Sequence, residues 1–182
     1  MDSFSEKTSD HIFRLIYVIR NAANFRSLVK YKDDFKQNYW IQICNNFFDV
    51  AILEWCKVFG TDSEPTHWKT IVNDHTEFRD GLLNCIGLDD KGWSAFWQGV
   101  NSYRNNIITH FKKIKVLSYP SLDVIIKSSF YYYEWLQKEL EKQGIIQEPK
   151  DLENYYLRCL SQAESFSDIA YNSTVNIEEK VF

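Results

Sequence analysis

The chain is poor in the two residues that most often interrupt regular structure, with 6 glycines and 3 prolines among its 182 residues. A sandwich or barrel of many short strands needs such turn residues at short intervals, so their scarcity disfavours both classes. The sequence also lacks an apolar run of about 18 residues, the length that spans a bilayer. Its N-terminus has neither the basic start nor the apolar core of a signal peptide. We therefore expect no membrane insertion and a cytoplasmic location.

Several familiar site signatures are missing as well. The four cysteines, Cys44, Cys56, Cys85 and Cys159, form no CxxC pair, and the four histidines show no zinc-binding spacing. The glycine-rich motifs of phosphate-binding loops and dinucleotide folds are absent, as is the GxSxG motif of serine hydrolases. We expect no metal and no cofactor. The scattered cysteines are typical of reduced thiols that pack as small apolar groups.

Apolar residues are plentiful and recur at helical spacing. The hydrophobic fraction is 45% and the aromatic fraction 16%, which is enough to form a core. Six helices are predicted by apolar periodicity, caps and closing glycines. They cover residues 9 or 10 to 30, 33 or 34 to 60, 67–86 with a break near Asn73, 91–113, 122–143 and 149–170. We expect an all-α fold with a four-helix up-and-down bundle core and additional flanking helices. A single domain over 1–171 would precede a flexible tail, 172–182.

The helix predicted over 91–113 carries the most suggestive chemistry. On a wheel of about 100° per residue, Arg104 and His110 flank its apolar stripe on opposite sides. Imidazole transfers protons near neutral pH, and a guanidinium neutralises charge that develops on a phosphate. The net charge of −4 disfavours indiscriminate nucleic-acid binding. A local basic run nevertheless follows this pair, comprising Lys112, Lys113 and Lys115. This combination favours a polyanionic substrate such as RNA.

A family resemblance rests on the same segment. Residues 103–111, YRNNIITHF, resemble the RNxxxxH form of the Arg–His motif of HEPN domains. A wider stretch, roughly 40 to 115, is similar to the abortive-infection branch of that superfamily. The residues that carry this wider similarity are Phe48-Asp49, Glu54-Trp55-Cys56-Lys57-Val58-Phe59-Gly60, His67-Trp68-Lys69, Phe78 and Tyr103-Arg104-Asn105.

The resemblance implies a metal-independent endoribonuclease of a phage-defence or toxin–antitoxin system. Arg104 and His110 take the catalytic places, and Asn105 the polar position beside the arginine. Asp49 is a candidate for positioning Arg104, and the three lysines would contact RNA. The resemblance also implies a homodimer in which two motifs meet, with an antitoxin or defence protein as a possible partner. The wheel agrees with a dimer, because two groups on opposite flanks of one helix do not readily meet.

Each of these residues also has a structural interpretation. Arg104 could form an ion pair with a neighbouring carboxylate, and His110 could lie half-buried near a helix C-terminus. The lysines could compensate the helix dipole, and Asp49 could be a hydrogen-bonded polar group inside the bundle. Two alternatives to catalysis therefore stay open. One is a HEPN-like module that binds a nucleotide or a partner protein without cleaving it, and the other is a helical accessory subunit.

Overall fold

The computed structural model describes residues 4–109 and 119–180, and all regular structure in these ranges is helical. The all-α class is confirmed. A 3-10 turn, η1 (Trp68–Thr70), precedes α3, and a π-helical segment, η2 (Arg104–Thr109), directly follows α4. The α-helices are α1 (Phe4–Val29), α2 (Asn38–Phe59), α3 (His75–Ile86), α4 (Asp90–Tyr103), α5 (Leu122–Glu141) and α6 (Leu152–Thr174). None of the described helices combines the length and apolarity that crossing a membrane requires.

Local sequence explains most helix ends. Asp74 accepts hydrogen bonds from the backbone N–H groups of Thr76 and Glu77, and Asp89 accepts one from that of Gly92. These side chains satisfy amides that have no partner inside the helix. Gly87 ends α3 with a φ of 70°, a conformation that glycine adopts without a steric cost. The break near Asn73 and the helix start at Asp89 or Asp90 are confirmed.

Other boundaries differ from the prediction. Helix α1 begins at Phe4, five residues or more before the expected cap, and Thr8 donates to the Phe4 carbonyl inside its first turns. Helix α2 begins only at Asn38, because residues 30–34 form turns instead. The last helix begins after Asp151, whose carboxylate caps it, and ends at Thr174 rather than near Ala170.

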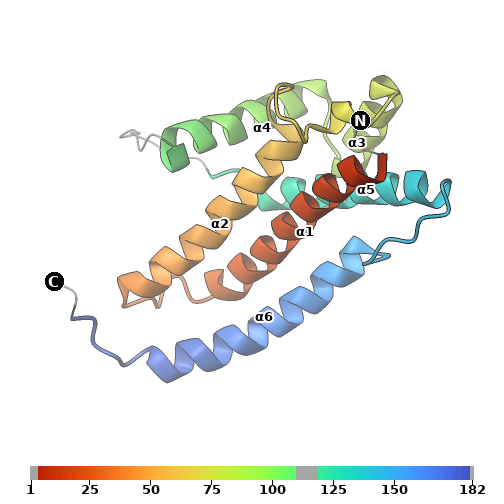
Figure 1. Ribbon diagram of the computed structural model, residues 1–182. Coiled ribbons are helices and arrows are strands. Elements are labelled where there is room, and N and C mark those ends of the chain that lie inside the picture. The colour runs from red at the N-terminus through yellow and green to blue at the C-terminus, as the bar shows by residue number, and fades with distance from the viewer. Residues whose placement is uncertain (1–3, 110–118, 181–182) are drawn as a thin grey trace.

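Helix α1 lies between α2 and α6. It runs antiparallel to α2, as the contacts of Arg14 with Glu54 and of Phe25 with Phe48 show. It runs parallel to α6, because its residues meet α6 residues in ascending order, from the Arg20–Tyr155 hydrogen bond to that between Ser27 and Ser167. Figure 1 shows the three helices side by side. One face of α1 is fully buried, at Leu15, Val18, Ile19, Ala22 and Ala23.

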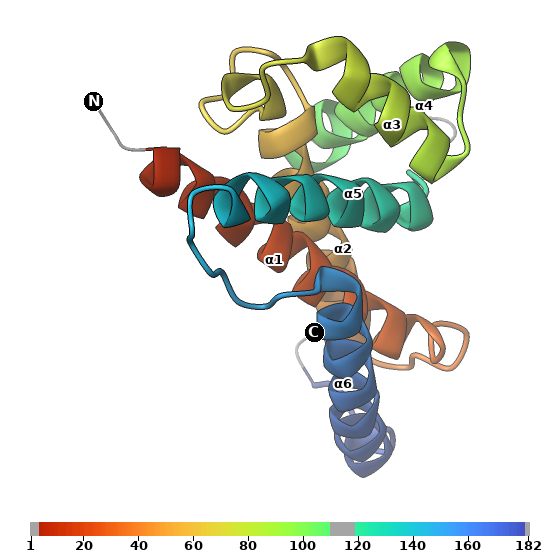
Figure 2. The ribbon, with the colours of Figure 1, turned by 90° about the vertical axis from the view of Figure 1, so that its right-hand side faces the viewer.

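The other end of the molecule holds α3, α4 and most of α5 (Figure 2). Helix α4 runs antiparallel to α2, since Trp93 packs against Phe59 and Tyr103 packs against Phe48. Helix α5 crosses α1, and the Trp55 indole N–H donates to Ser128 in the core between α2 and α5. An aromatic core around Trp55 therefore holds α2, α4 and α5 together and positions the end of α4 beside α2.

Candidate functional site

The predicted motif begins where α4 changes its helical form. An α-helix was expected to continue from Lys91 to about Lys113, but it ends at Tyr103 and a π-helix covers Arg104–Thr109. The sequence there, RNNIIT, suits an α-helix poorly, because asparagine side chains compete for backbone groups and β-branched residues lose rotamer freedom. A helical wheel of about 100° per residue therefore does not describe the positions after Tyr103. π-helical turns are rare and occur often at functional sites.

Arg104 is the described residue of the predicted catalytic pair. Its guanidinium lies 3.7 Å from a carboxylate oxygen of Glu64, in the loop after α2, and its side chain is 19% exposed. Its Nε donates to the Asn105 side-chain oxygen at 3.0 Å. It also lies close to the buried Cys56 thiol: burial raises the pKa of Cys56 to about 12, and the neighbouring guanidinium acts in the opposite direction. Arg104 therefore sits in a partly enclosed polar site between α2 and the loop.

Asp49 reaches this site through a neighbour of Arg104. The Tyr103 hydroxyl donates to the Asp49 carboxylate at 2.8 Å, which joins the middle of α2 to the last residue of α4. Burial raises the pKa of Asp49, and the hydrogen bond from Tyr103 opposes that shift. Burial also raises the pKa of Tyr103, so the hydroxyl stays protonated and keeps donating. This hydrogen bond holds the end of α4 against α2, directly before Arg104.

Of the remaining motif residues, Asn105 lies beside Arg104. Asn105 is exposed and accepts from Arg104. His110, Lys112, Lys113 and Lys115 lie outside the described residues. The structure therefore brings together Arg104, Asn105, Tyr103 and Asp49.

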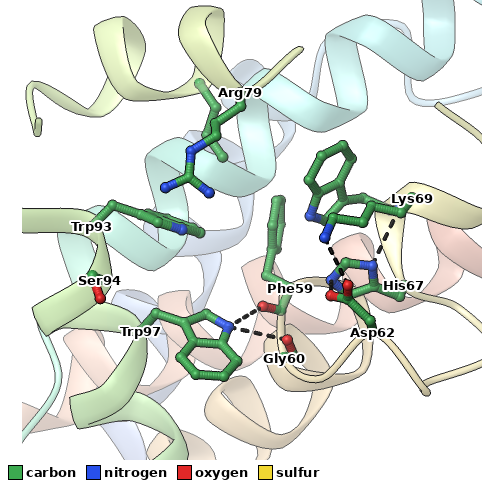
Figure 3. Close-up of a pocket in the computed structure, with 11 residues that line it drawn as sticks. Phe59, Gly60, Asp62, His67, Lys69, Arg79, Trp93, Ser94 and Trp97 are labelled. Carbon is green, nitrogen blue, oxygen red and sulfur yellow. Dashed lines mark hydrogen bonds and ion pairs between the residues drawn. The ribbon is translucent and has the colours of Figure 1, made fainter. Parts of the chain in front are cut away.

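A second concave site lies nearby and was not singled out by the sequence. It is a pocket of about 200 Å³ between the end of α2, the loop after it, α3 and α4. Tryptophans wall the pocket, and Lys69 and Arg79 bring positive charge to it (Figure 3). The residues come from four separate segments. Phe59-Gly60 and His67-Trp68-Lys69 are among the residues that carry the family resemblance, but sequence spacing does not place them beside Arg79 and Trp97.

Neither a metal-binding cluster in the described part of the chain nor a known relative adds information about these sites. Within the described residues, no group of three or more histidine, cysteine, aspartate or glutamate side chains could hold a metal ion. Searches of protein-family models, of curated proteins and of solved structures find no match to the chain.

Proposed function

We propose that the protein is a HEPN-like endoribonuclease that cleaves RNA without a metal ion, in phage defence or a toxin–antitoxin system. The observation that carries the proposal is the setting of Arg104. A partly buried arginine begins a π-helical turn, beside a partly buried tyrosine–aspartate pair, in the segment that resembles the HEPN motif. A rare helical form in that segment supports a functional role.

The proposed reaction uses the two motif residues in separate roles. His110 removes the proton from a ribose 2′-OH, and the 2′-oxygen attacks the adjacent phosphorus. The bond from phosphorus to the 5′-oxygen breaks, and that oxygen takes up a proton from water. The products are a 2′,3′-cyclic phosphate and a 5′-hydroxyl. Arg104 stabilises the negative charge on the phosphate oxygens during attack.

The neighbours of the pair have supporting roles in the proposal. Asn105 holds the guanidinium through its side-chain oxygen, and Asp49 positions Arg104 through Tyr103. Lys112, Lys113 and Lys115 contact the RNA backbone. The proposed core is the four-helix bundle of α1, α2, α4 and α5. It is supported by the directions of α1 and α4, which both run antiparallel to α2, and by the packing of α5 on α2 through Trp55 and Phe59.

The direct test is cleavage of RNA by the purified protein in EDTA. We expect activity in the wild type and a loss of about 100-fold or more in His110→Ala and in Arg104→Ala, because general acid–base catalysis contributes a factor of about 10²–10⁴. The matched controls are His75→Ala and Arg158→Ala, which replace an exposed histidine and an exposed arginine elsewhere. Activity that survives both motif substitutions contradicts the proposal.

The proposed active species is a homodimer in the cytoplasm, with an antitoxin or defence protein as a further partner. The helical wheel gives this dimer no support, because it assumes an α-helix from Arg104 to position 110, whereas Arg104–Thr109 form a π-helix. Sedimentation at micromolar concentration is the test, and a strictly monomeric active enzyme contradicts this part of the proposal.

One observation favours the helical accessory subunit. Glu64 already pairs with Arg104, as a structural arginine would. A HEPN-like module that binds a nucleotide or a partner protein would instead use Arg104 and His110 to bind phosphate without cleaving it. Overexpression separates these functions. A ribonuclease toxin slows growth unless His110 is replaced, whereas a binding module or accessory subunit does not.

A further inference from the structure

The pocket between α2, α3 and α4 is lined on one side by Trp97, which is partly buried. The Trp97 indole N–H donates to the Phe59 carbonyl at 2.7 Å and to the Gly60 carbonyl at 3.0 Å, which fixes the ring beside the end of α2. Among the described residues no other aromatic ring packs on Trp97. Trp68, by contrast, stacks on Phe78 at 4.6 Å.

The cations at the pocket pair with exposed carboxylates. Lys69 pairs with Asp62 at 2.7 Å, and Arg79 pairs with Asp90 at 2.8 Å. The two carboxylates are 70% and 77% exposed, and such surface ion pairs contribute little to stability. An anionic ligand can therefore take over both cations at a small cost. In Figure 3 the Arg79 guanidinium points from α3 into the pocket.

His67 adds no charge to this site at neutral pH. It is 2% exposed, and its Nδ1 accepts from the backbone N–H of Lys69. Burial lowers the pKa of His67 to about 4, against a smaller opposing effect of Asp62. The pocket lining therefore carries two cations and one carboxylate, Asp62. This balance disfavours a cationic ligand, although aromatic walls can also bind cations.

We propose that this pocket binds one nucleotide, with the base against Trp97 and the phosphate on Arg79 and Lys69. A planar π-system and an anion together match the two features of the lining, since bases stack on tryptophan and phosphates pair with arginine. The volume of about 200 Å³ lies below the range of about 300–1,000 Å³ for drug-sized ligands. It suits one base with its sugar phosphate at the mouth.

The site goes beyond the proposed cleavage, because it needs neither Arg104 nor His110. The two sites are nevertheless neighbours. Trp97 and Arg104 are seven positions apart, which is two turns and about 10 Å along a helix. Glu64 and Asp62 belong to the same loop, one at each site. The nucleotide can thus be free in solution or part of a single strand that continues toward Arg104.

Calorimetry and tryptophan fluorescence test the proposal on the full chain. The probes are the four ribonucleoside monophosphates and a short 2′-O-methyl oligonucleotide, which cannot be cleaved by 2′-OH attack. Ribose 5-phosphate and the free nucleosides are the matched fragments. We expect saturable binding of a nucleotide or of the oligonucleotide, at least about tenfold tighter than of either fragment, because base stacking and phosphate pairing both contribute.

The variants Arg79→Gln and Lys69→Gln should each weaken this binding about tenfold, and Arg158→Gln, on the exposed side of α6, should leave it unchanged. Trp97→Phe keeps an aromatic ring and should weaken binding less than Trp97→Ala. Both cation variants remove only a surface pair, so they test the site even if Trp97→Ala fails to fold.

Binding of the monophosphates identifies a free nucleotide as the source, and binding of the oligonucleotide alone identifies a strand. Absence of saturable binding by both, equal binding of ribose 5-phosphate, or binding unaffected by Arg79→Gln and Lys69→Gln overturns the proposal. Cleavage is not measured, so failure of the proposed ribonuclease activity does not affect this outcome.

Discussion

Glu64 and a substrate phosphate would compete for the same guanidinium. The Glu64–Arg104 contact of 3.7 Å is long for a charge-assisted hydrogen bond, and both side chains are partly exposed. A pair of this kind stabilises a protein by up to about 1 kcal/mol. It therefore holds Arg104 in place without preventing its transfer to a phosphate.

Replacing Glu64 with glutamine should strengthen RNA binding by up to about fivefold, because the competing charge is removed at a cost in stability below about 1 kcal/mol. The dissociation constant for an uncleavable oligonucleotide is the measurement, with urea unfolding as the stability check. Glu141→Gln removes an equal charge from the end of α5 and is the control. Weaker binding in Glu64→Gln than in the control would mean that Glu64 orients Arg104 rather than competing for it.

His11 is the other residue whose setting makes a quantitative prediction. It is 1% exposed, and its ring nitrogens contact the Tyr132 hydroxyl at 2.8 Å and Thr70 at 3.4 Å. Burial lowers the pKa of His11 to about 4, against a smaller opposing effect of Asp10 and a further lowering by His67. The folded state therefore binds a proton at His11 less readily than the unfolded state does.

Because the folded pKa lies below the unfolded value of 6.5, His11 contributes stability that is present above pH 6.5 and is lost as the pH falls toward 4. At about 1.4 kcal/mol per pKa unit, the loss is on the order of 3 kcal/mol. Urea unfolding at several pH values between 7.5 and 4 should show this slope. It should be shallower in His11→Gln than in the wild type. Parallel profiles for wild type and His11→Gln would refute the assignment.

At the scale of elements, the sequence predicts several helix ends but not the change from α-helix to π-helix at Arg104. Capping aspartates and closing glycines act over a few residues, so the break near Asn73 and the ends at Gly87 and Asp89 are predictable. Apolar periodicity does not predict the π-helix at Arg104, because the apolar stripe of the predicted helix continues without a break to Ile107. The π-helix follows from the weak α-helical preference of the Asn-Asn-Ile-Ile-Thr run together with the packing of Tyr103 on α2.

Asn106→Ala tests whether the π-helical form of this segment matters for function. Its side chain donates to Ser102 at 3.0 Å on an exposed part of the helix, a bond worth about as much as the gain in helix propensity from alanine. We expect the free energy of unfolding to change by less than about 0.5 kcal/mol. If the π-helical register positions His110 for catalysis, RNA cleavage should fall at least about tenfold. Full activity in a stable Asn106→Ala variant would show that the register is irrelevant to catalysis.

The candidate sites, too, contain some residues that the sequence predicts and others that only tertiary contacts bring together. Arg104 stands out in the sequence because a motif is local, and Asp49 because a carboxylate within an apolar helix needs a partner. The Tyr103 hydroxyl that satisfies Asp49 comes from another helix, and Trp97, Lys69 and Arg79 meet only when α3 and α4 fold against the end of α2. Sequence spacing does not contain such tertiary contacts. The pocket could therefore be found only in the structure.

At the scale of the whole molecule, α6 lies at one end and the candidate sites at the other, and α1 extends between them, from His11 beside Thr70 to Ser27 beside Ser167. The sequence predicted a flexible tail from Asn172, but α6 continues to Thr174, and the following residues bind the start of α2. Gln37 donates to the carbonyl oxygens of Thr174, Val175 and Ile177, at 3.1, 3.0 and 2.9 Å. The backbone N–H of Asn38 donates to Glu179 at 2.7 Å. These contacts connect the last helix to the turn between α1 and α2.

Removing residues 172–182 should therefore destabilise the protein by about 2 kcal/mol, because a buried amide loses its acceptors and the Trp40 indole N–H loses Thr174. Removing only 178–182 keeps all three carbonyls and should cost less than about 0.5 kcal/mol. Gln37→Ala should cost less than the longer truncation, because it leaves the Trp40–Thr174 hydrogen bond in place, and the two changes combined should cost less than their sum. Urea unfolding measures all four proteins. A neutral longer truncation would restore the flexible tail that the sequence suggested, and additive losses would mean that Gln37 and the C-terminal segment stabilise the fold independently.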